Sequence, residues 1–212
     1  MFIDRRHAGE RLGALLVPLA GPNVVVLGIP RGGVEVAAVV AEMLGAPLDV
    51  VIPRKVGAPG NPELGLGAVA EGVEVIDERL VRILGVSGGY LRREIAREQE
   101  EISRRSARYR GDRPPVPLAG KIVIVVDDGV ATGGTAVAAL RKARNDGAAK
   151  VILAVPVAPR EALERLQMEA DEVRVCAFPE PFYAVGQWYE EFGQVSDARV
   201  IELLSPTSAA GQ

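Results

Sequence analysis

Short apolar runs alternate with segments of helical periodicity along most of the chain. Continuous apolar runs are typical of strands buried on both faces of a sheet, whereas apolar residues spaced three and four apart are typical of helices. The runs predict strands over residues 23–30, 48–54, 121–128, 150–157 and 172–178. The periodic segments predict helices over residues 4–20, 33–46, 134–148 and 160–169. This alternation predicts an α/β fold, a Rossmann-like core in which helices flank a parallel sheet.

Two segments interrupt the alternation. Residues 56–72 are rich in glycine, which predicts a mobile loop followed by a short hairpin that ends near residue 76. Residues 87–113 are strongly charged, and Glu100 with Arg104 and Glu101 with Arg105 have the spacing of favourable helix pairs. We interpret this segment as a solvated helix that rests on the domain, because its arginines are interleaved with glutamates.

These patterns together predict one domain over residues 1–212. Its core comprises about residues 21–55 and 119–178, and residues 56–118 supply a flexible loop and inserted helices. A small hood comes from residues 178–204, with residues 1–20 as a further candidate part of it.

Composition narrows the class of protein. The chain has 212 residues, of which 48% are hydrophobic, enough for one substantial core. The chain has a net charge of -3 and therefore lacks the broad positive field that drives nucleic-acid binding, so we expect no nucleic-acid partner. No run of about 18 uncharged apolar residues occurs, and we therefore expect a soluble, cytoplasmic protein without a membrane partner.

Cysteine and histidine contribute little chemistry. Cys176 is the single cysteine and lies in an apolar run, which predicts an inert core thiol and excludes an intramolecular disulfide. His7 is the single histidine, so sites built from several histidines are excluded.

The stretch VIVVDDGVATGGT, residues 123–135, carries the strongest functional signal. A buried strand ends on Asp127 and Asp128, and ligands bind beyond the carboxyl ends of strands in open parallel sheets. The loop that follows consists of small residues and leads into a helix, whose free N–H groups favour a phosphate. Because carboxylates repel phosphate, the aspartates would serve sugar hydroxyls, or Mg²⁺ through water. The ligand is therefore expected to be a sugar phosphate.

Two competing phosphate motifs do not fit. A P-loop requires lysine before its last Ser or Thr, where this chain has Gly134, and a dinucleotide-binding fold requires G-x-G-x-x-G after the first strand, which is absent.

The stretch resembles the signature of the type I phosphoribosyltransferases. These enzymes bind 5-phosphoribosyl-1-pyrophosphate (PRPP) with Mg²⁺ and transfer phosphoribose to a nucleobase. The resemblance implies that Asp127 and Asp128 hold the ribose hydroxyls and, through water, Mg²⁺. It also implies that the loop encloses the 5′-phosphate with Ala131, Thr132, Gly133, Gly134 and Thr135.

A second resemblance lies after the first strand. GIPRGG, residues 28–33, is similar to the pyrophosphate loop of the family, which implies pyrophosphate binding by Arg31, Gly32 and Gly33 and a cis peptide between Pro30 and Arg31. Lys55, or alternatively Arg54, has the place of a lysine that faces pyrophosphate. The glycine-rich segment 56–72 corresponds to a loop that closes over the reaction.

The base-binding residues would come from the hood. Its segment PEPFYAVGQWY is similar to that of the purine enzymes, which implies stacking of a base on Phe182 with Trp188 nearby. Ala131 replaces the aspartate that handles the purine in the hypoxanthine and guanine enzymes, so the loop is closer to the adenine enzymes. A general base would then come from elsewhere, with Glu63 and Glu71 as candidates.

The resemblance leaves two alternatives and one question of assembly. A PRPP-sensing regulator would keep the site without transfer, and some relatives of that kind bind nucleic acid, for which the arginines of residues 92–113 are the candidate. A different sugar-phosphate enzyme would not need the GIPRGG segment. Dimers are common in the family, so a homodimer stays open.

Overall fold

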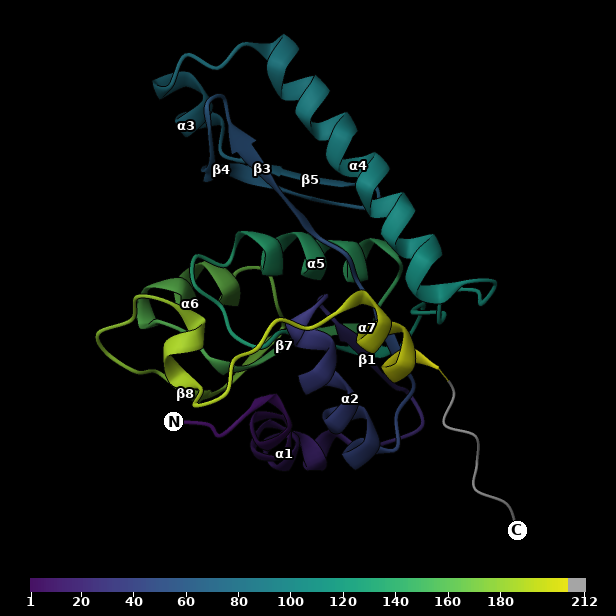
Figure 1. The fold of residues 1–212 in the computed structure, drawn as a ribbon. Helices are drawn as coiled ribbons and strands as arrows, with labels where there is room; N and C mark the ends of the chain where they lie inside the picture. The colour runs from purple at the N-terminus through teal and green to yellow at the C-terminus, as the bar shows by residue number, and fades with distance from the viewer. Residues whose placement is uncertain (206–212) are drawn as a thin grey trace.

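The structure is a computed structural model that describes residues 1–205, in which the strands form two sheets (Figure 1). The larger sheet contains β1 (Val24–Gly28), β2 (Leu48–Val50), β6 (Ile122–Val126), β7 (Lys150–Val157) and β8 (Glu172–Ala177). The smaller sheet contains β3 (Arg54–Ala58), β4 (Asn61–Ala70) and β5 (Val73–Ile76). The α-helices are α1 (Arg5–Leu16), α2 (Gly32–Leu44), α3 (Glu78–Ile83), α4 (Gly88–Arg110), α5 (Gly134–Asn145), α6 (Arg160–Gln167) and α7 (Asp197–Leu204).

The larger sheet is parallel throughout, with the strand order β2-β1-β6-β7-β8. The chain runs outward from β1 to β2 in one direction and from β6 to β8 in the other, so the order reverses between β1 and β6. Gly28 pairs with Val126 at the carboxyl ends of these two strands. The expected α/β fold with a parallel sheet is confirmed.

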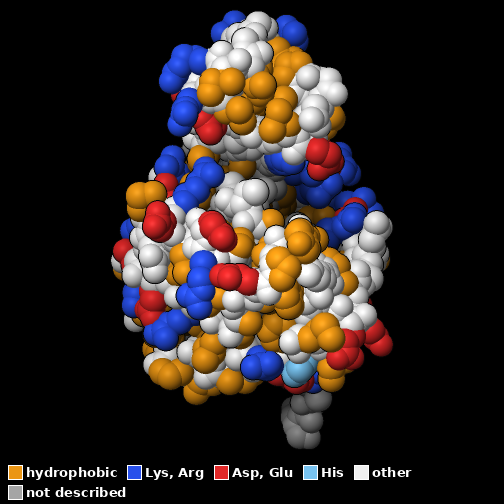
Figure 2. Space-filling view, turned by 90° about the vertical axis from the view of Figure 1, so that its left-hand side faces the viewer, with side chains coloured by type: hydrophobic (Ala, Val, Ile, Leu, Met, Phe, Trp, Pro, Cys, Tyr) orange, Lys and Arg blue, Asp and Glu red, His pale blue; other side chains and the backbone are white. Residues whose placement is uncertain are grey.

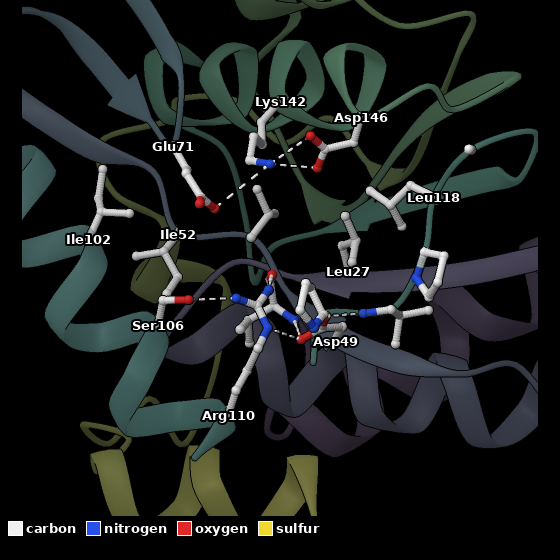
Figure 3. A pocket seen from close by; sticks show the side chains of 16 residues that line it. Leu27, Asp49, Ile52, Glu71, Ile102, Ser106, Arg110, Leu118, Lys142 and Asp146 are labelled. Carbon is white, nitrogen blue, oxygen red and sulfur yellow. Dashed lines mark hydrogen bonds and ion pairs between the residues drawn. The ribbon is translucent and has the colours of Figure 1, made fainter. Parts of the chain in front are cut away.

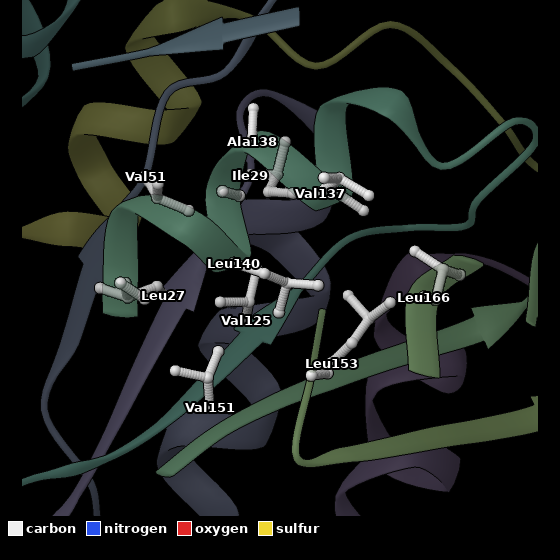
Figure 4. Close-up of a cluster of buried hydrophobic side chains, with 14 of the residues drawn as sticks. Leu27, Ile29, Val51, Val125, Val137, Ala138, Leu140, Val151, Leu153 and Leu166 are labelled. Carbon is white, nitrogen blue, oxygen red and sulfur yellow. The ribbon is translucent and has the colours of Figure 1, made fainter. Parts of the chain in front are cut away.

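Helices cover both faces of the sheet because its strands are apolar on both sides. Val24 and Val26 of β1 face α1 and α2, whereas Val25 and Leu27 face α5. Figure 4 shows the second of these clusters, in which Leu140 of α5 lies over the strands. The predicted helix over residues 4–20 ends earlier, at Leu16, and Val17–Leu19 form a 3₁₀ turn that contains Pro18. Proline lacks the N–H group that an α-helix would need at this point.

The loop predicted in residues 56–72 is wrong, because β3, β4 and β5 form an antiparallel sheet, whereas the short hairpin predicted to end near residue 76 is confirmed as β4 and β5. Its glycines permit close approach of the strands: a Cβ atom on Gly67 would lie 2.1 Å from the carbonyl oxygen of Val75. One face of the sheet packs on α5 through Ala68 and Ala70. The other face packs on α4, to which Val69 contributes.

The charged segment forms the long helix α4, which lies across the smaller sheet (Figure 1). It is anchored by buried Ile102 and Tyr109. Glu101 pairs with Arg105, as predicted, at 2.6 Å. Arg104 was predicted to pair with Glu100, but it pairs with Glu101 at 2.7 Å. The two oxygens of the Glu101 carboxylate thus accept from both Arg104, three residues on, and Arg105, four residues on. None of the helices in the described part of the chain is long and apolar enough to cross a membrane.

The N-terminal residues lie beside the C-terminal segment, residues 178–204. Phe2 donates its N–H to the carbonyl of Trp188 at 2.8 Å and forms a parallel bridge with Tyr189. The following helix, α1, packs against α2 and the sheet. The N-terminal residues and residues 188–191 therefore lie side by side.

Candidate active site

Two loops meet where the strand order reverses. The GIPRGG turn, residues 28–33, leaves β1, and residues 127–135 leave β6, the neighbouring strand. Reversal points of open parallel sheets form a crevice in which ligands bind. The sequence predicted both loops as site elements, and the sheet order brings them together.

The glycines of the GIPRGG turn lie directly against the acidic pair, Asp127 and Asp128. A Cβ atom on Gly32 would lie 1.9 Å from Oδ2 of Asp128, and one on Gly33 would lie 2.7 Å from the Cα of Asp127. Because neither distance can accommodate a side chain, glycine is required at both positions. The peptide between Pro30 and Arg31 is cis, as the resemblance implied.

The acidic pair is internally bonded and partly shielded from water. The N–H of Asp128 donates to Oδ1 of Asp127 at 2.8 Å. Burial, followed by the neighbouring charge of Asp128, raises the pKa of Asp127 well above its ordinary value.

Arg5 is a site residue that the sequence did not reveal. Its Nε donates to Oδ2 of Asp128 at 2.8 Å, and its Nη1 donates to the carbonyl of Gly193 at 2.8 Å. The guanidinium also lies 3.9 Å from the centre of the Phe192 ring. Nothing in the charged N-terminal sequence distinguishes Arg5 from its neighbours, because its partners are distant along the chain.

Tyr189 is the second residue that the sequence did not single out. Its hydroxyl donates to the carbonyl of Asp128 at 2.5 Å, so the C-terminal segment contacts the backbone of the acidic pair. Burial, followed by the charge of Asp128, raises the pKa of Tyr189 well above its ordinary value. The phenol therefore stays protonated and acts as a donor.

The predicted phosphate loop, residues 131–135, leads into the N-terminus of α5. Gly133 has a φ of +79° at the cap position, and no side chain caps this end of the helix. The N–H groups of the first turn thus lack intrahelical partners, and the helix dipole favours an anion there. A Cβ atom on Gly134 would meet nothing within 4 Å, so the loop has open space beside it.

The cationic candidates differ in their surroundings. Arg31 is half-exposed at the start of α2, and its Nη1 lies 3.9 Å from Oδ1 of Asp197. Arg54 is bound by buried Glu98, Nε to Oε2, at 2.7 Å. Lys55 contacts Glu63 of β4 and has no contact with the acidic pair in the described residues. Arg31 thus belongs to the turn beside the acidic pair while its guanidinium lies near Asp197, and Arg54 and Lys55 lie in the smaller sheet.

The predicted aromatic residues lie together. Phe182 and Trp188 stack with ring centroids 6.3 Å apart and an interplanar angle of 29°. Phe182 lines a hollow of about 770 Å³ that also includes Ala131 and Thr132, whereas Trp188 lies behind Phe182 and does not line it. The phosphate loop and the C-terminal segment therefore face one space.

The candidate general bases lie elsewhere. The carboxylate of Glu71 is 3.8 Å from the amino group of Lys142, near the C-terminal end of α5. Glu63 contacts Lys55 of β3. Neither contacts the acidic pair or Phe182 within residues 1–205.

An open parallel sheet with a glycine-rich loop at a helix N-terminus and an acidic pair at its reversal point defines an α/β protein with a candidate ligand crevice at that point. The family model of the phosphoribosyl transferase domain matches residues 10–187, and the chain therefore belongs to the phosphoribosyl transferase family.

Two relatives are similar over nearly all of this chain. TT1426 from Thermus thermophilus, a crystal structure, is 49% identical with a TM-score of 0.81, covering 96% of this chain and 97% of that one. The Mycobacterium tuberculosis (strain ATCC 25618 / H37Rv) protein named "Putative phosphoribosyl transferase Rv0571c" is 46% identical over 205 residues. This match covers 96% of the present chain but only 46% of the relative, so the chain spans about half the length of that curated relative.

Proposed function

We propose that this chain transfers 5-phosphoribose from PRPP to a nucleobase, with a purine favoured, and releases pyrophosphate. The observation that carries the proposal is the contact of Gly32 and Gly33 with Asp127 and Asp128. This contact joins a turn suited to pyrophosphate, a pair of hydroxyl acceptors and a phosphate loop in one crevice.

The phosphate loop would bind the 5′-phosphate. The N–H groups at the start of α5 point out of the helix, and the hydroxyls of Thr132 and Thr135 add donors. Both threonines are at least partly exposed, as a ligand contact requires.

The acidic pair would accept hydrogen bonds from the ribose hydroxyls. Arg5 contacts Oδ2 of Asp128, and within residues 1–205 no partner contacts Oδ1, which leaves that oxygen for a hydroxyl. Arg5 thereby fixes the orientation of the carboxylate before PRPP binds, and this lowers the cost of ordering the site.

Magnesium fits this site only together with the substrate. The described residues contain no group of three or more His, Cys, Asp or Glu side chains that could hold a metal. Mg²⁺ commonly binds through one or two carboxylates while phosphates and waters fill its other positions. Asp127 and Asp128 would hold it in this way, and the ion would neutralise negative charge on the departing pyrophosphate.

Transfer requires no nucleophile from the protein. The bond between the anomeric carbon and pyrophosphate breaks with its electron pair on pyrophosphate, and a ring nitrogen of the base supplies the electron pair of the new bond while the base loses a proton to solvent. Arg31 would stabilise the leaving group, and Lys55 would do so after it leaves Glu63. Positioning and electrostatics account for the catalysis.

The hollow between Ala131 and Phe182 would accept the base. Phe182 offers a ring face for stacking, and Trp188 supports that ring from behind. The absence of a carboxylate at Ala131 favours a base that does not need one at this point, such as adenine.

The direct test is pyrophosphate release from PRPP and Mg²⁺ with adenine, guanine, hypoxanthine, xanthine, uracil and orotate supplied one at a time. The proposal expects release that depends on one base, most strongly a purine. Binding of PRPP without release for any base would contradict it and would favour the PRPP-sensing alternative. Ala131 is the observation that favours this alternative, because the hypoxanthine and guanine enzymes have an aspartate at this position that acts on the base.

A further inference from the structure

A second pocket of about 510 Å³ lies between the smaller sheet, α4 and the far end of α5 (Figure 3). Its volume is within the range of small-molecule sites, roughly 300 to 1,000 Å³. It shares no lining residue with the phosphate loop, the acidic pair or the GIPRGG turn. It therefore requires an explanation of its own.

Arg110 of α4 forms one side of this α4–α5 pocket. Its Nε donates to Asp49 at 2.8 Å, its Nη1 to Ser106 at 2.6 Å and its Nη2 to the carbonyl of Val50 at 2.7 Å. A guanidinium has five N–H donors. Three are used, so one N–H on each terminal nitrogen has no partner among residues 1–205. Arg110 is thus held in place by three hydrogen bonds while two of its N–H groups stay available.

Lys142 and two carboxylates form the opposite side (Figure 3). The amino group of Lys142 contacts Asp146 at 2.6 Å and lies 3.8 Å from Glu71. The side chain of Glu71 is 71% exposed, and within the described residues its carboxylate accepts no hydrogen bond, so it is free to accept one. This side therefore offers hydrogen-bond acceptors across from the donors of Arg110.

The charges on the pocket wall argue against a phosphate. Arg110 is neutralised by Asp49, whose side chain is buried, and Lys142 is neutralised by Asp146. With Glu71 the wall carries three carboxylates against two cations, and an anionic ligand would be repelled. Aliphatic side chains separate the two polar sides, as Figure 3 shows for Leu27, Ile52, Ile102 and Leu118.

We infer that the α4–α5 pocket binds a guanine nucleoside. Arginine pairs in a bidentate manner with O6 and N7 of guanine, which matches the two remaining donors of Arg110. The N1–H and N2–H groups on another edge of guanine are donors suited to Glu71. The flat base lies between the aliphatic sides, and the absence of a phosphate on the ligand suits the negative wall.

This site is independent of the proposed transfer reaction. Its ligand would contact α4 and the β4–β5 turn of the inserted segment and α5 of the core, and would link the two parts. Binding should therefore raise the temperature of unfolding, because a ligand that binds only the folded state stabilises it.

Isothermal titration calorimetry with guanosine on the full chain tests the inference, and adenosine serves as the matched ligand. Adenine presents an amino group where guanine has O6, so adenosine should bind at least about fivefold more weakly. Ser106→Tyr should fill the pocket and reduce guanosine affinity at least about tenfold, the loss expected when a bidentate base contact is prevented. Ser103→Tyr is the control, because Ser103 lies on the same helix and is exposed.

A second variant protects the test against failure of Ser106→Tyr to fold. Glu71→Ala should weaken guanosine binding, whereas Glu74→Ala, an exposed glutamate on β5, should not. Saturating PRPP and Asp128→Asn should both leave guanosine binding unchanged. The inference would be overturned if guanosine did not bind, or if adenosine bound equally well. It would also be overturned if Ser106→Tyr or Glu71→Ala bound guanosine with full affinity, or if PRPP competed with guanosine.

Discussion

Replacing Asp128 with asparagine keeps the shape of the side chain and removes its charge. The substitution should weaken productive use of PRPP by about 1.5 to 3 kcal/mol, the range for a hydrogen bond to a charged group. The measurement is kcat/KM for PRPP in the pyrophosphate-release assay. Asp112→Asn, an exposed aspartate after α4, is the control, and unchanged kcat/KM in Asp128→Asn would contradict the assignment.

Arg5 and Arg6 are neighbours with different surroundings. The side chain of Arg5 is 9% exposed and bound to Asp128, whereas that of Arg6 is 73% exposed and paired with Glu10 of the same helix. Arg5→Ala leaves Asp128 without its cation and should lower the free energy of unfolding by about 3 kcal/mol. Arg6→Ala should lower it by less than about 1 kcal/mol. The measurement is urea denaturation of both variants. Equal midpoints and slopes for Arg5→Ala and Arg6→Ala would show that the two arginines do not differ in their contribution to stability.

Residues with local signals were predicted from the sequence, and residues with distant partners were not. Asp127, Asp128 and the GIPRGG turn stand at strand ends, where the pattern itself points to a site. Arg5 is 123 residues from Asp128, and Tyr189 is 61 residues from it. The periodicity of a sequence carries no information about contacts between residues so far apart. The roles of Arg5 and Tyr189 are therefore visible only in the folded structure.

At the scale of elements, the turn between β1 and α2 must pass very close to the end of β6. Gly32→Ala would place its Cβ 1.9 Å from Asp128 Oδ2 and 2.7 Å from Arg5 Nε, which forces the carboxylate to move. A displacement of about 1 Å at a reacting site can cost roughly 100-fold in rate, so a loss of at least tenfold in pyrophosphate release is expected. Gly21→Ala, where a Cβ meets nothing within 4 Å, should retain the activity.

The contact of α7 with α4 should weaken in acid. Asp197 accepts from the Tyr109 hydroxyl at 2.7 Å and lies 2.8 Å from Arg108, and these groups hold its pKa below the ordinary 3.8. A depressed pKa contributes stability above pH 3.8 that is lost as the pH falls through the lower, folded-state value.

The free energy of unfolding should therefore decline more steeply on acidification in the wild-type protein than in Asp197→Asn. Asp112→Asn should keep the wild-type slope, since Asp112 is exposed. Parallel curves for the wild type and Asp197→Asn, from urea denaturation at several pH values, would show that this ion pair does not contribute.

The smaller sheet shows why one group of elements was not predicted. Glycine usually indicates a turn, but a β-bulge or a close approach of strands also requires it. The register of β3 and β4 shifts around Gly57, and Gly67 lies against the backbone of β5. Glycines at such positions interrupt the apolar alternation by which strands are recognised.

At the scale of the whole molecule, the inserted segment and the core share apolar clusters. Val50 and Ile52 of the core region pack with Val56, Leu66 and Ile102. Figure 2 shows a narrowing between the upper part and the body, with basic side chains gathered beside it. The pattern of alternating elements predicted the core sheet. The packing between the inserted segment and the core could not be predicted in this way, because it involves side chains that only the folded chain brings together.

Shared packing predicts a single cooperative transition. Trp188, the one tryptophan, reports on the C-terminal segment by its fluorescence, while hydrogen exchange of β4 amides reports on the smaller sheet. Both should give the same midpoint in urea, as expected for two-state unfolding of a single domain. Separate midpoints would indicate that the inserted segment unfolds on its own and would contradict the single-domain prediction.

The contacts of Arg5 also bear on when the crevice forms during synthesis. Arg5 leaves the ribosome before both of its partners, Asp128 and Gly193, and Gly193 is 188 residues later in the chain. The sheet can begin to assemble once β6 has emerged, but the carboxylate of Asp128 is fixed only after the aromatic segment has followed. A nascent chain therefore has its core sheet before the carboxylate of Asp128 is fixed, and the crevice is complete only after the segment around Gly193 has been translated.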